Sequence, residues 1–145
     1  MQVLVAVDLN DADAEAFVAQ AATWVTALGG VADLLFVDES ADQHPYIMEP
    51  TLRASMSVHY DDWRRHMAKR IEALRDTLPQ GARGSAELVR GRAAPVILER
   101  LEAGHDVVIL GNRAASGLAR LAHGVVAERV SRQATKPVVI LPRAS

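Results

Sequence analysis

The segment Val3-Leu4-Val5-Ala6-Val7-Asp8 restricts the fold more than any other part of the chain. Its apolar residues are nearly unbroken and rich in β-branched side chains, as in a strand that is covered on both faces of a parallel sheet. Val107-Val108-Ile109-Leu110-Gly111 repeats this pattern late in the sequence. Two buried strands so far apart predict an α/β fold in which helices cover both faces of the sheet.

Strands and helices alternate between and beyond these two segments. The expected strands are Val3 to Val7, Val31 to Val37, an edge strand Ser85 to Arg90, Val107 to Leu110, and Val138 to Leu141. Four helices are expected: the first ends at Gly29-Gly30, the second runs from Met56 to Leu78, the third runs from Ala94 to Leu101, and the fourth follows Gly124. The segment Ser40 to Thr51 is expected to be a loop. This order predicts one domain over residues 1–145, with a doubly wound five-stranded parallel sheet and four helices on both faces.

Composition excludes several classes of protein. The 145 residues carry 16 Lys and Arg against 18 Asp and Glu, a net charge of −2, so the basic stripe of a nucleic-acid-binding surface is not expected. Cysteine is absent, which excludes disulfides and thiolate chemistry. The sequence contains no run of 18 apolar residues, so a membrane span is not expected. Met1-Gln2 leads directly into an expected strand, and this start does not have the pattern of a signal peptide. We therefore expect a cytoplasmic protein that contacts neither nucleic acid nor membrane.

Ligands of open parallel sheets bind beyond the carboxyl ends of the strands, where the winding reverses. Asp8 follows the first strand and Gly111 follows the fourth. If these strands are neighbours, the carboxylate and the glycine-bearing turn face one crevice. Asp8 can accept hydrogen bonds from ligand hydroxyls or amines there, and it can equally cap the following helix.

The segment from Gly111 to Gly124 is rich in small residues. Such residues let a backbone approach a phosphate, and the free N–H groups of a following helix favour anions. Arg113 can add positive charge to such a site, or remain a solvated loop residue. Small residues are also what tight turns require, so both interpretations of the segment stay open.

The chain resembles the universal stress protein family. The resemblance rests on Asp8, on the five-strand order, and on a fourth-strand loop of the form G-x-x-G, nine residues, G-(S/T), which here has Ala114 and Val125 at two of its positions. It extends over the segments Val3 to Asp8, Gly91 to Ile97, and Val107 to Leu141.

Membership of this family would imply a strand order of 3-2-1-4-5 and, in the members with the full glycine pattern, ATP binding. Val7 and Asp8 would then lie against the base and ribose, and Val37 would line the adenine pocket. The phosphates, with or without Mg²⁺, would be surrounded by Leu110, Gly111, Ala114, Gly124, Val125 and Val126.

Ala114 and Val125 depart from the family pattern. Ala114 would be strained only at a positive φ, and Val125 lacks a hydroxyl whose hydrogen bond is typically worth about 0.5–1.5 kcal/mol. The two changes predict weakened or altered nucleotide binding. The function is therefore either that of a regulator binding ATP or a related adenine nucleotide, or that of a nucleotide-free dimeric interaction module.

Other chemistry has little support in the sequence. Phosphate-binding P-loop, dinucleotide-binding and nucleophile-elbow motifs do not occur, so at most weak ATP hydrolysis is expected. His59, Asp62 and His66 share a helix face that is expected to be solvated rather than metal-binding. The apolar stripe through Met56, Trp63 and Met67 is expected to pack on the sheet. Pro137 to Leu141, at a sheet edge, is the expected homodimer contact.

Overall fold

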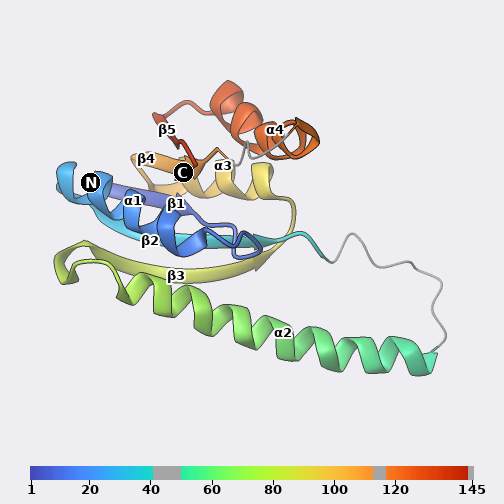
Figure 1. The fold of residues 1–145 in the computed structure, drawn as a ribbon. Helices are drawn as coiled ribbons and strands as arrows, with labels where there is room; N and C mark the ends of the chain where they lie inside the picture. Colours follow the sequence, from blue (N-terminus) through green and yellow to red (C-terminus); the bar gives the residue numbers. More distant parts are fainter. Residues whose placement is uncertain (41–49, 113–116, 144–145) are drawn as a thin grey trace.

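The protein, described here from a computed structural model, is a five-stranded parallel sheet with helices on both faces (Figure 1). The backbone is described for residues 1–40, 50–112 and 117–143, and the side chains for all of these except 50–55 and 117–124. The strands are β1 (Gln2–Ala6), β2 (Val31–Asp38), β3 (Arg83–Arg90), β4 (Val107–Gly111) and β5 (Val138–Leu141). The helices are α1 (Ala14–Ala27), α2 (Pro50–Asp76), the short 3-10 helix η2 (Gln80–Ala82), α3 (Ala93–Gly104) and α4 (Gly117–Gln133).

The strand order β3-β2-β1-β4-β5 confirms the predicted topology. β1 lies at the centre, paired in parallel with β2 on one side and with β4 on the other. The winding direction therefore reverses between β1 and β4, which places the ends of these two strands at the switch point of the sheet.

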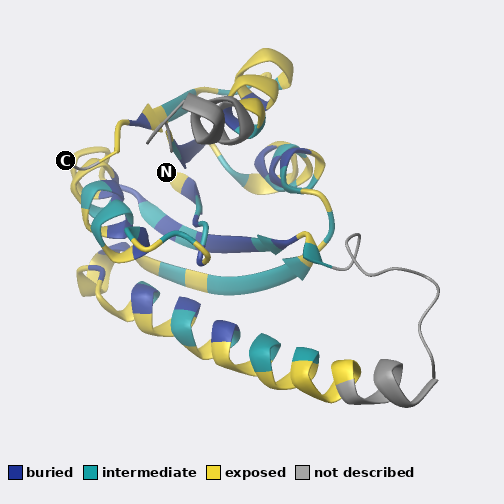
Figure 2. Ribbon diagram, turned by 45° about the vertical axis from the view of Figure 1, so that its right-hand side comes forward, coloured by how far each residue is buried: buried dark blue, intermediate teal, exposed yellow. Residues whose placement is uncertain are grey.

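Two apolar layers hold the helices on the sheet. α1 and α2 pack on one face around Val3, Val5 and Ile71, and α3 and α4 pack on the other around Leu4 and Val108. Figure 2 shows the consequence for α2, whose buried side faces the sheet while its opposite side is exposed. Because Val3, Leu4 and Val5 are all buried, β1 is covered on both faces, as its unbroken apolar sequence predicted.

Two expectations about helix α2 are corrected. α2 begins at Pro50, within the expected loop Ser40 to Thr51, because proline suits the first position of a helix. The apolar stripe is buried at Met67 but not at Met56, which is exposed near the end of α2 that projects past the sheet in Figure 1. Residues 41–49 of the expected loop lie outside the described residues.

The start of helix α4 was also predicted wrongly. The helix begins at Gly117 rather than after Gly124, so Gly124 and Val125 lie within it. The residues from Leu118 to Ala122 are leucine, alanine and arginine, which are strong helix formers. A single interior glycine costs only about 1 kcal/mol relative to alanine, so Gly124 does not end or delay the helix.

Candidate functional site: a cleft at the carboxyl ends of the strands

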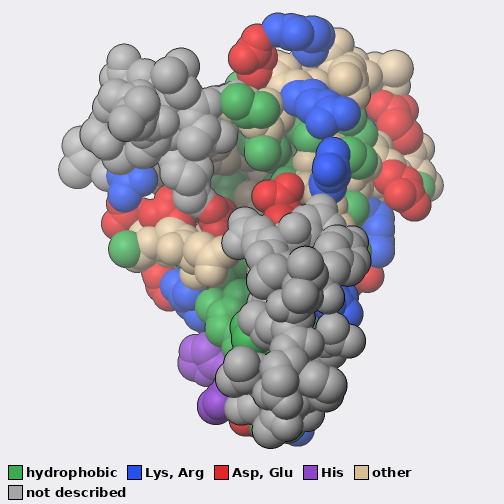
Figure 3. Space-filling view, turned by 90° about the vertical axis from the view of Figure 1, so that its right-hand side faces the viewer, with side chains coloured by type: hydrophobic (Ala, Val, Ile, Leu, Met, Phe, Trp, Pro, Cys, Tyr) green, Lys and Arg blue, Asp and Glu red, His purple; other side chains and the backbone are tan. Residues whose placement is uncertain are grey.

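A cleft of about 600 Å³ opens at the carboxyl ends of β1, β2 and β4. Figure 3 looks onto this end of the molecule, where acidic and hydrophobic side chains share a recess. Asp8 and Gly111, one from each side of the switch point, both line the cleft. The position agrees with the general rule for open α/β sheets, and the volume suits a nucleotide-sized ligand.

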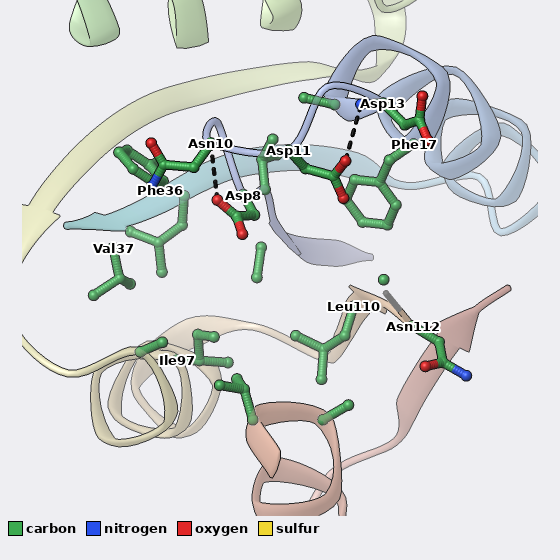
Figure 4. A pocket seen from close by; sticks show the side chains of 18 of the residues that line it. Asp8, Asn10, Asp11, Asp13, Phe17, Phe36, Val37, Ile97, Leu110 and Asn112 are labelled. Carbon is green, nitrogen blue, oxygen red and sulfur yellow. Dashed lines mark hydrogen bonds between the residues drawn. The ribbon is translucent and has the colours of Figure 1, made fainter. Parts of the chain in front are cut away.

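One wall of the cleft is apolar. It is formed by the ends of β2 and β4 and by the facing sides of α3 and α4 (Figure 4). The residues of this wall are Val37, Ala93, Ile97, Leu110, Val126 and Ala127. Such a surface fits the flat, poorly hydrated face of a purine or another aromatic ring.

The opposite wall is the polar loop between β1 and α1. Asp8 Oδ1 accepts a hydrogen bond of 2.9 Å from the Asn10 backbone N–H, and Asp11 Oδ1 accepts one of 3.0 Å from the Asp13 backbone N–H (Figure 4). These bonds close two successive Asx turns. Asp8 therefore shapes the loop ahead of α1 rather than capping the helix, whose N-cap residue is Asp13.

A buried carboxylate, Asp38, closes the cleft at the end of β2. Its side chain is 2 % exposed, and it accepts hydrogen bonds from the Ser40 backbone N–H at 2.8 Å and from the Ser40 and Tyr60 hydroxyls. Burial raises the pKa of Asp38, but these hydrogen bonds and the nearby Arg64 guanidinium outweigh it and hold the pKa below its ordinary value. Asp38 thus ties α2 to the rim of the cleft.

Two further contacts fix the rim. Glu39 Oε1 accepts a hydrogen bond of 2.7 Å from the Ala93 backbone N–H, so the residue that follows β2 caps the start of α3. The Phe17 ring, on the first turns of α1, lies beside Gly111 at the end of β4. Asp38, Glu39 and Phe17 were not predicted as site residues, and only the acidic ending of β2, which resembles that of β1, gave a signal in the sequence.

The predicted nucleotide-contacting residues fall into three groups. Six of them line the cleft: Val7, Asp8, Val37, Leu110, Gly111 and Val126. Val125 does not line it and is 56 % exposed on α4. Gly124 lies inside α4, and Arg113 and Ala114 lie outside the described residues.

The polar face on α2 is exposed at His59, Asp62 and His66, and Asp62 forms an ion pair with Arg65 at 2.7 Å. Within the described ranges, no three histidine, cysteine or acidic side chains are placed to hold a metal ion. Nor does any helix in the described part of the chain combine the length and hydropathy of a membrane span.

The sheet order, the two helical layers and the cleft at the switch point define a doubly wound α/β protein. A model of the universal stress protein family matches residues 1–142, and the chain belongs to this family. The sequence comparison with curated proteins gave no match.

Solved structures of the same fold are distant in sequence. A universal stress protein family member from Burkholderia pseudomallei superposes with a TM-score of 0.71 at 19 % identity, over 98 % of this chain and 96 % of that one. A universal stress protein in complex with cAMP gives a TM-score of 0.62 at 16 % identity, over 98 % and 96 % of the two chains. The universal stress protein from Archaeoglobus fulgidus in complex with dAMP gives 0.56 at 20 % identity, over 97 % and 96 %.

Proposed function

We propose that this protein is a stress-response regulator that binds an adenine nucleotide in the cleft between β1 and β4. The proposal rests on one observation: Asp8 and Gly111 line the same cleft, and the wall opposite the Asp8 loop is apolar. The family membership and the two relatives solved with cAMP and dAMP support an adenine ligand.

The lining fits the parts of such a ligand. The apolar wall around Val37, Ile97 and Leu110 accepts the adenine ring, and the Asp8 carboxylate accepts hydrogen bonds from the ribose hydroxyls. The phosphates extend toward Gly111. Mg²⁺ is usually held by one or two carboxylates together with substrate phosphates, so it would enter with the ligand.

Calorimetric titration of the full chain tests this function. The probes are adenosine, AMP, ADP and ATP, each with and without Mg²⁺. We expect micromolar to millimolar binding of at least one probe, and a roughly tenfold loss in Asp8→Asn, which keeps the Asx turn but removes the charge. Asp62→Asn, an exposed carboxylate on α2, is the matched control and should bind as the original chain does. No heat with any probe up to millimolar concentration would reject nucleotide binding.

A nucleotide-free dimeric module is the second candidate function. The departures from the family pattern favour it, because Ala114 replaces a glycine and Val125 lacks the hydroxyl of the usual serine or threonine. The double variant Ala114→Gly, Val125→Ser discriminates between the two. A gain of ATP binding from none would support a degenerate site, whereas tight binding before and after the change would exclude it.

We also propose that the protein forms a homodimer through the Pro137 to Leu141 segment. β5 pairs with β4 on one side only and ends the sheet. Ile140, on this strand, is 41 % exposed. An apolar edge strand is a ready template for pairing with a second copy.

A further inference from the structure

The residue that follows β5 by two positions, Arg143, reaches the candidate cleft. β5 pairs with β4 so that Leu141 lies opposite Gly111, and the Asn112 backbone N–H donates to the Leu141 carbonyl at 2.8 Å. The chain therefore leaves the sheet beside Gly111 and Asn112. Pro142 and Arg143 both line the cleft as a result.

Arg143 is held at this position by the loop between β1 and α1. Its Nη2 lies 2.8 Å from Asp13 Oδ2 and 3.6 Å from Asp11 Oδ1. The side chains of Arg143 and Asp13 are 35 % and 44 % exposed, so water screens the pair. Partly exposed ion pairs contribute little to stability, and the guanidinium can exchange partners at small cost.

The charges around Arg143 favour such an exchange when an anion enters. Five carboxylates line the cleft, and Arg143 is the cation among its described lining residues. Asp38 is already hydrogen bonded to Ser40 and Tyr60, and Glu39 to the start of α3. A phosphate brought toward Gly111 would meet a negative field there unless a cation turned toward it.

We propose that Arg143 is the phosphate-recognising residue of the cleft and that Asp13 holds it until a phosphorylated ligand binds. The guanidinium leaves Asp13 and donates a pair of hydrogen bonds to the phosphate, a geometry that arginine matches well. This inference rests on the proposed nucleotide function. It makes the cleft selective for nucleotides over nucleosides through a residue outside the glycine pattern.

Titration with adenosine and AMP separates this inference from the proposed function. In Arg143→Ala we expect AMP binding to weaken roughly tenfold or more, while adenosine binding stays within about twofold. Arg143→Lys, which keeps the charge but loses the paired donors, should give an intermediate loss. The matched control is Arg132→Ala, which removes an exposed arginine that pairs with Glu128 on α4.

The opposite change is expected in Asp13→Asn. Asparagine is as good an N-cap as aspartate, so α1 is kept, and the released arginine should tighten AMP binding about threefold or more. Removal of a negative charge also favours anions through space, so Asp13→Asn is measured again in the Arg143→Ala background. The gain should disappear there if it depends on Arg143.

Each outcome decides one claim. Unchanged AMP binding in Arg143→Ala overturns the role of Arg143, and so does a gain from Asp13→Asn that persists in full in the double variant. If the original chain binds none of adenosine, AMP, ADP and ATP, the nucleotide function fails and this inference fails with it. If it binds only ADP or ATP, that nucleotide takes the place of AMP in the same comparison of variants. If adenosine binds and AMP gains nothing from Arg143, only the inference on Arg143 is lost. Thermal unfolding of every variant verifies that the fold is retained.

Discussion

Substitution of Gly111 by alanine tests whether this glycine is required for the stability of the fold or for the binding of a ligand. Gly111 ends β4 and is not among the described glycines with positive φ, which are Gly29 and Gly91. A Cβ built on Gly111 would lie 3.4 Å from the nearest carbons of the Phe17 ring, close to an ordinary van der Waals contact. The backbone conformation and the packing therefore both accept alanine at this position.

The expected change in stability is small and positive. Replacing glycine by alanine at a compatible position stabilises a protein by about 0.4–1 kcal/mol, because the unfolded chain loses conformational freedom. Unfolding entropy of about 2.1 cal/mol/K per residue gives about 0.3 kcal/mol/K for a chain of this length. Gly111→Ala should therefore raise Tm by about 1–3 °C in differential scanning calorimetry.

The expected change in binding has the opposite sign. Gly111 lines the cleft, and the added methyl group occupies space beside the backbone that a phosphate has to approach. We expect AMP to bind roughly tenfold more weakly in Gly111→Ala, measured by calorimetric titration. The combination of a higher Tm and a weaker affinity would show that this glycine serves the ligand.

Gly84→Ala is the contrasting variant. A Cβ on Gly84 would lie 2.2 Å from Asp33 Oδ1 and 2.5 Å from the Ala32 carbonyl oxygen, so β2 and β3 would have to move apart. Such overpacking typically costs about 1–3 kcal/mol, which lowers Tm by about 3–10 °C. A Tm of Gly111→Ala that falls as far as that of Gly84→Ala, or an unchanged AMP affinity in Gly111→Ala, would refute the reasoning.

Three further predictions concern stability and assembly. Tyr60→Phe removes a hydrogen bond to the buried Asp38 carboxylate, which typically costs about 1.5–3 kcal/mol and should lower Tm by about 5–10 °C in a calorimetric scan. The lowered pKa of Asp38 stabilises the fold above the unfolded value of about 3.9, and this contribution is lost as the pH falls through the folded value. Urea unfolding from pH 7 to pH 3 should therefore show a shallower acid limb in Asp38→Asn, and an equally steep limb would contradict this. Ile140→Lys should convert the proposed dimer to monomer in sedimentation at micromolar concentration, and a monomeric original chain would count against the dimer.

The fold could be predicted because its central strands carry an unambiguous pattern. Val3, Leu4 and Val5 are all buried, and a short run of β-branched apolar residues without polar alternation is typical of a strand covered on both faces. A strand of this kind needs helices on both faces of the sheet. Because parallel strands are joined by crossover connections, these helices were expected between successive strands in the sequence. Gly29, with φ of +63°, ends α1 where the Gly29-Gly30 pair predicted.

The errors in the fold arose where local propensity and tertiary context disagree. Glycine at position 124 was interpreted as a break before the helix, but the leucine and alanine residues after Gly117 sustain α4 through it. Met56 continues the spacing of the buried stripe on α2, yet it is exposed, and the end of α2 on which it lies projects past the sheet in Figure 1. Periodicity shows which face of a helix is apolar, but it does not show where the sheet ends.

The position of the cleft was predictable, whereas most of its hydrogen bonds were not. Asp8 and Asp38 both come directly after a run of apolar residues, so the sequence gives them the same signature. Their environments differ, because Tyr60 from a distant helix donates to Asp38 while Asp8 closes a turn with Asn10 two residues away. Burial of a carboxylate is tolerated only where donors compensate its desolvation, and such donors arrive through tertiary packing.

Arg143 shows the same limit most clearly. In the sequence it is a charge near the end of the chain, far from Asp11 and Asp13. The pairing of β5 with β4, and of β4 with β1, carries it to the loop that begins α1. This cleft therefore combines charges from segments that are far apart in the sequence, among them the loop after β1, the end of β2 and the residues after β5, and a phosphate-binding arginine there has no sequence motif of its own. The role of Arg143 therefore has to be inferred from the strand order and the ion pairs, and it is tested by substitution of Asp13, with which it pairs.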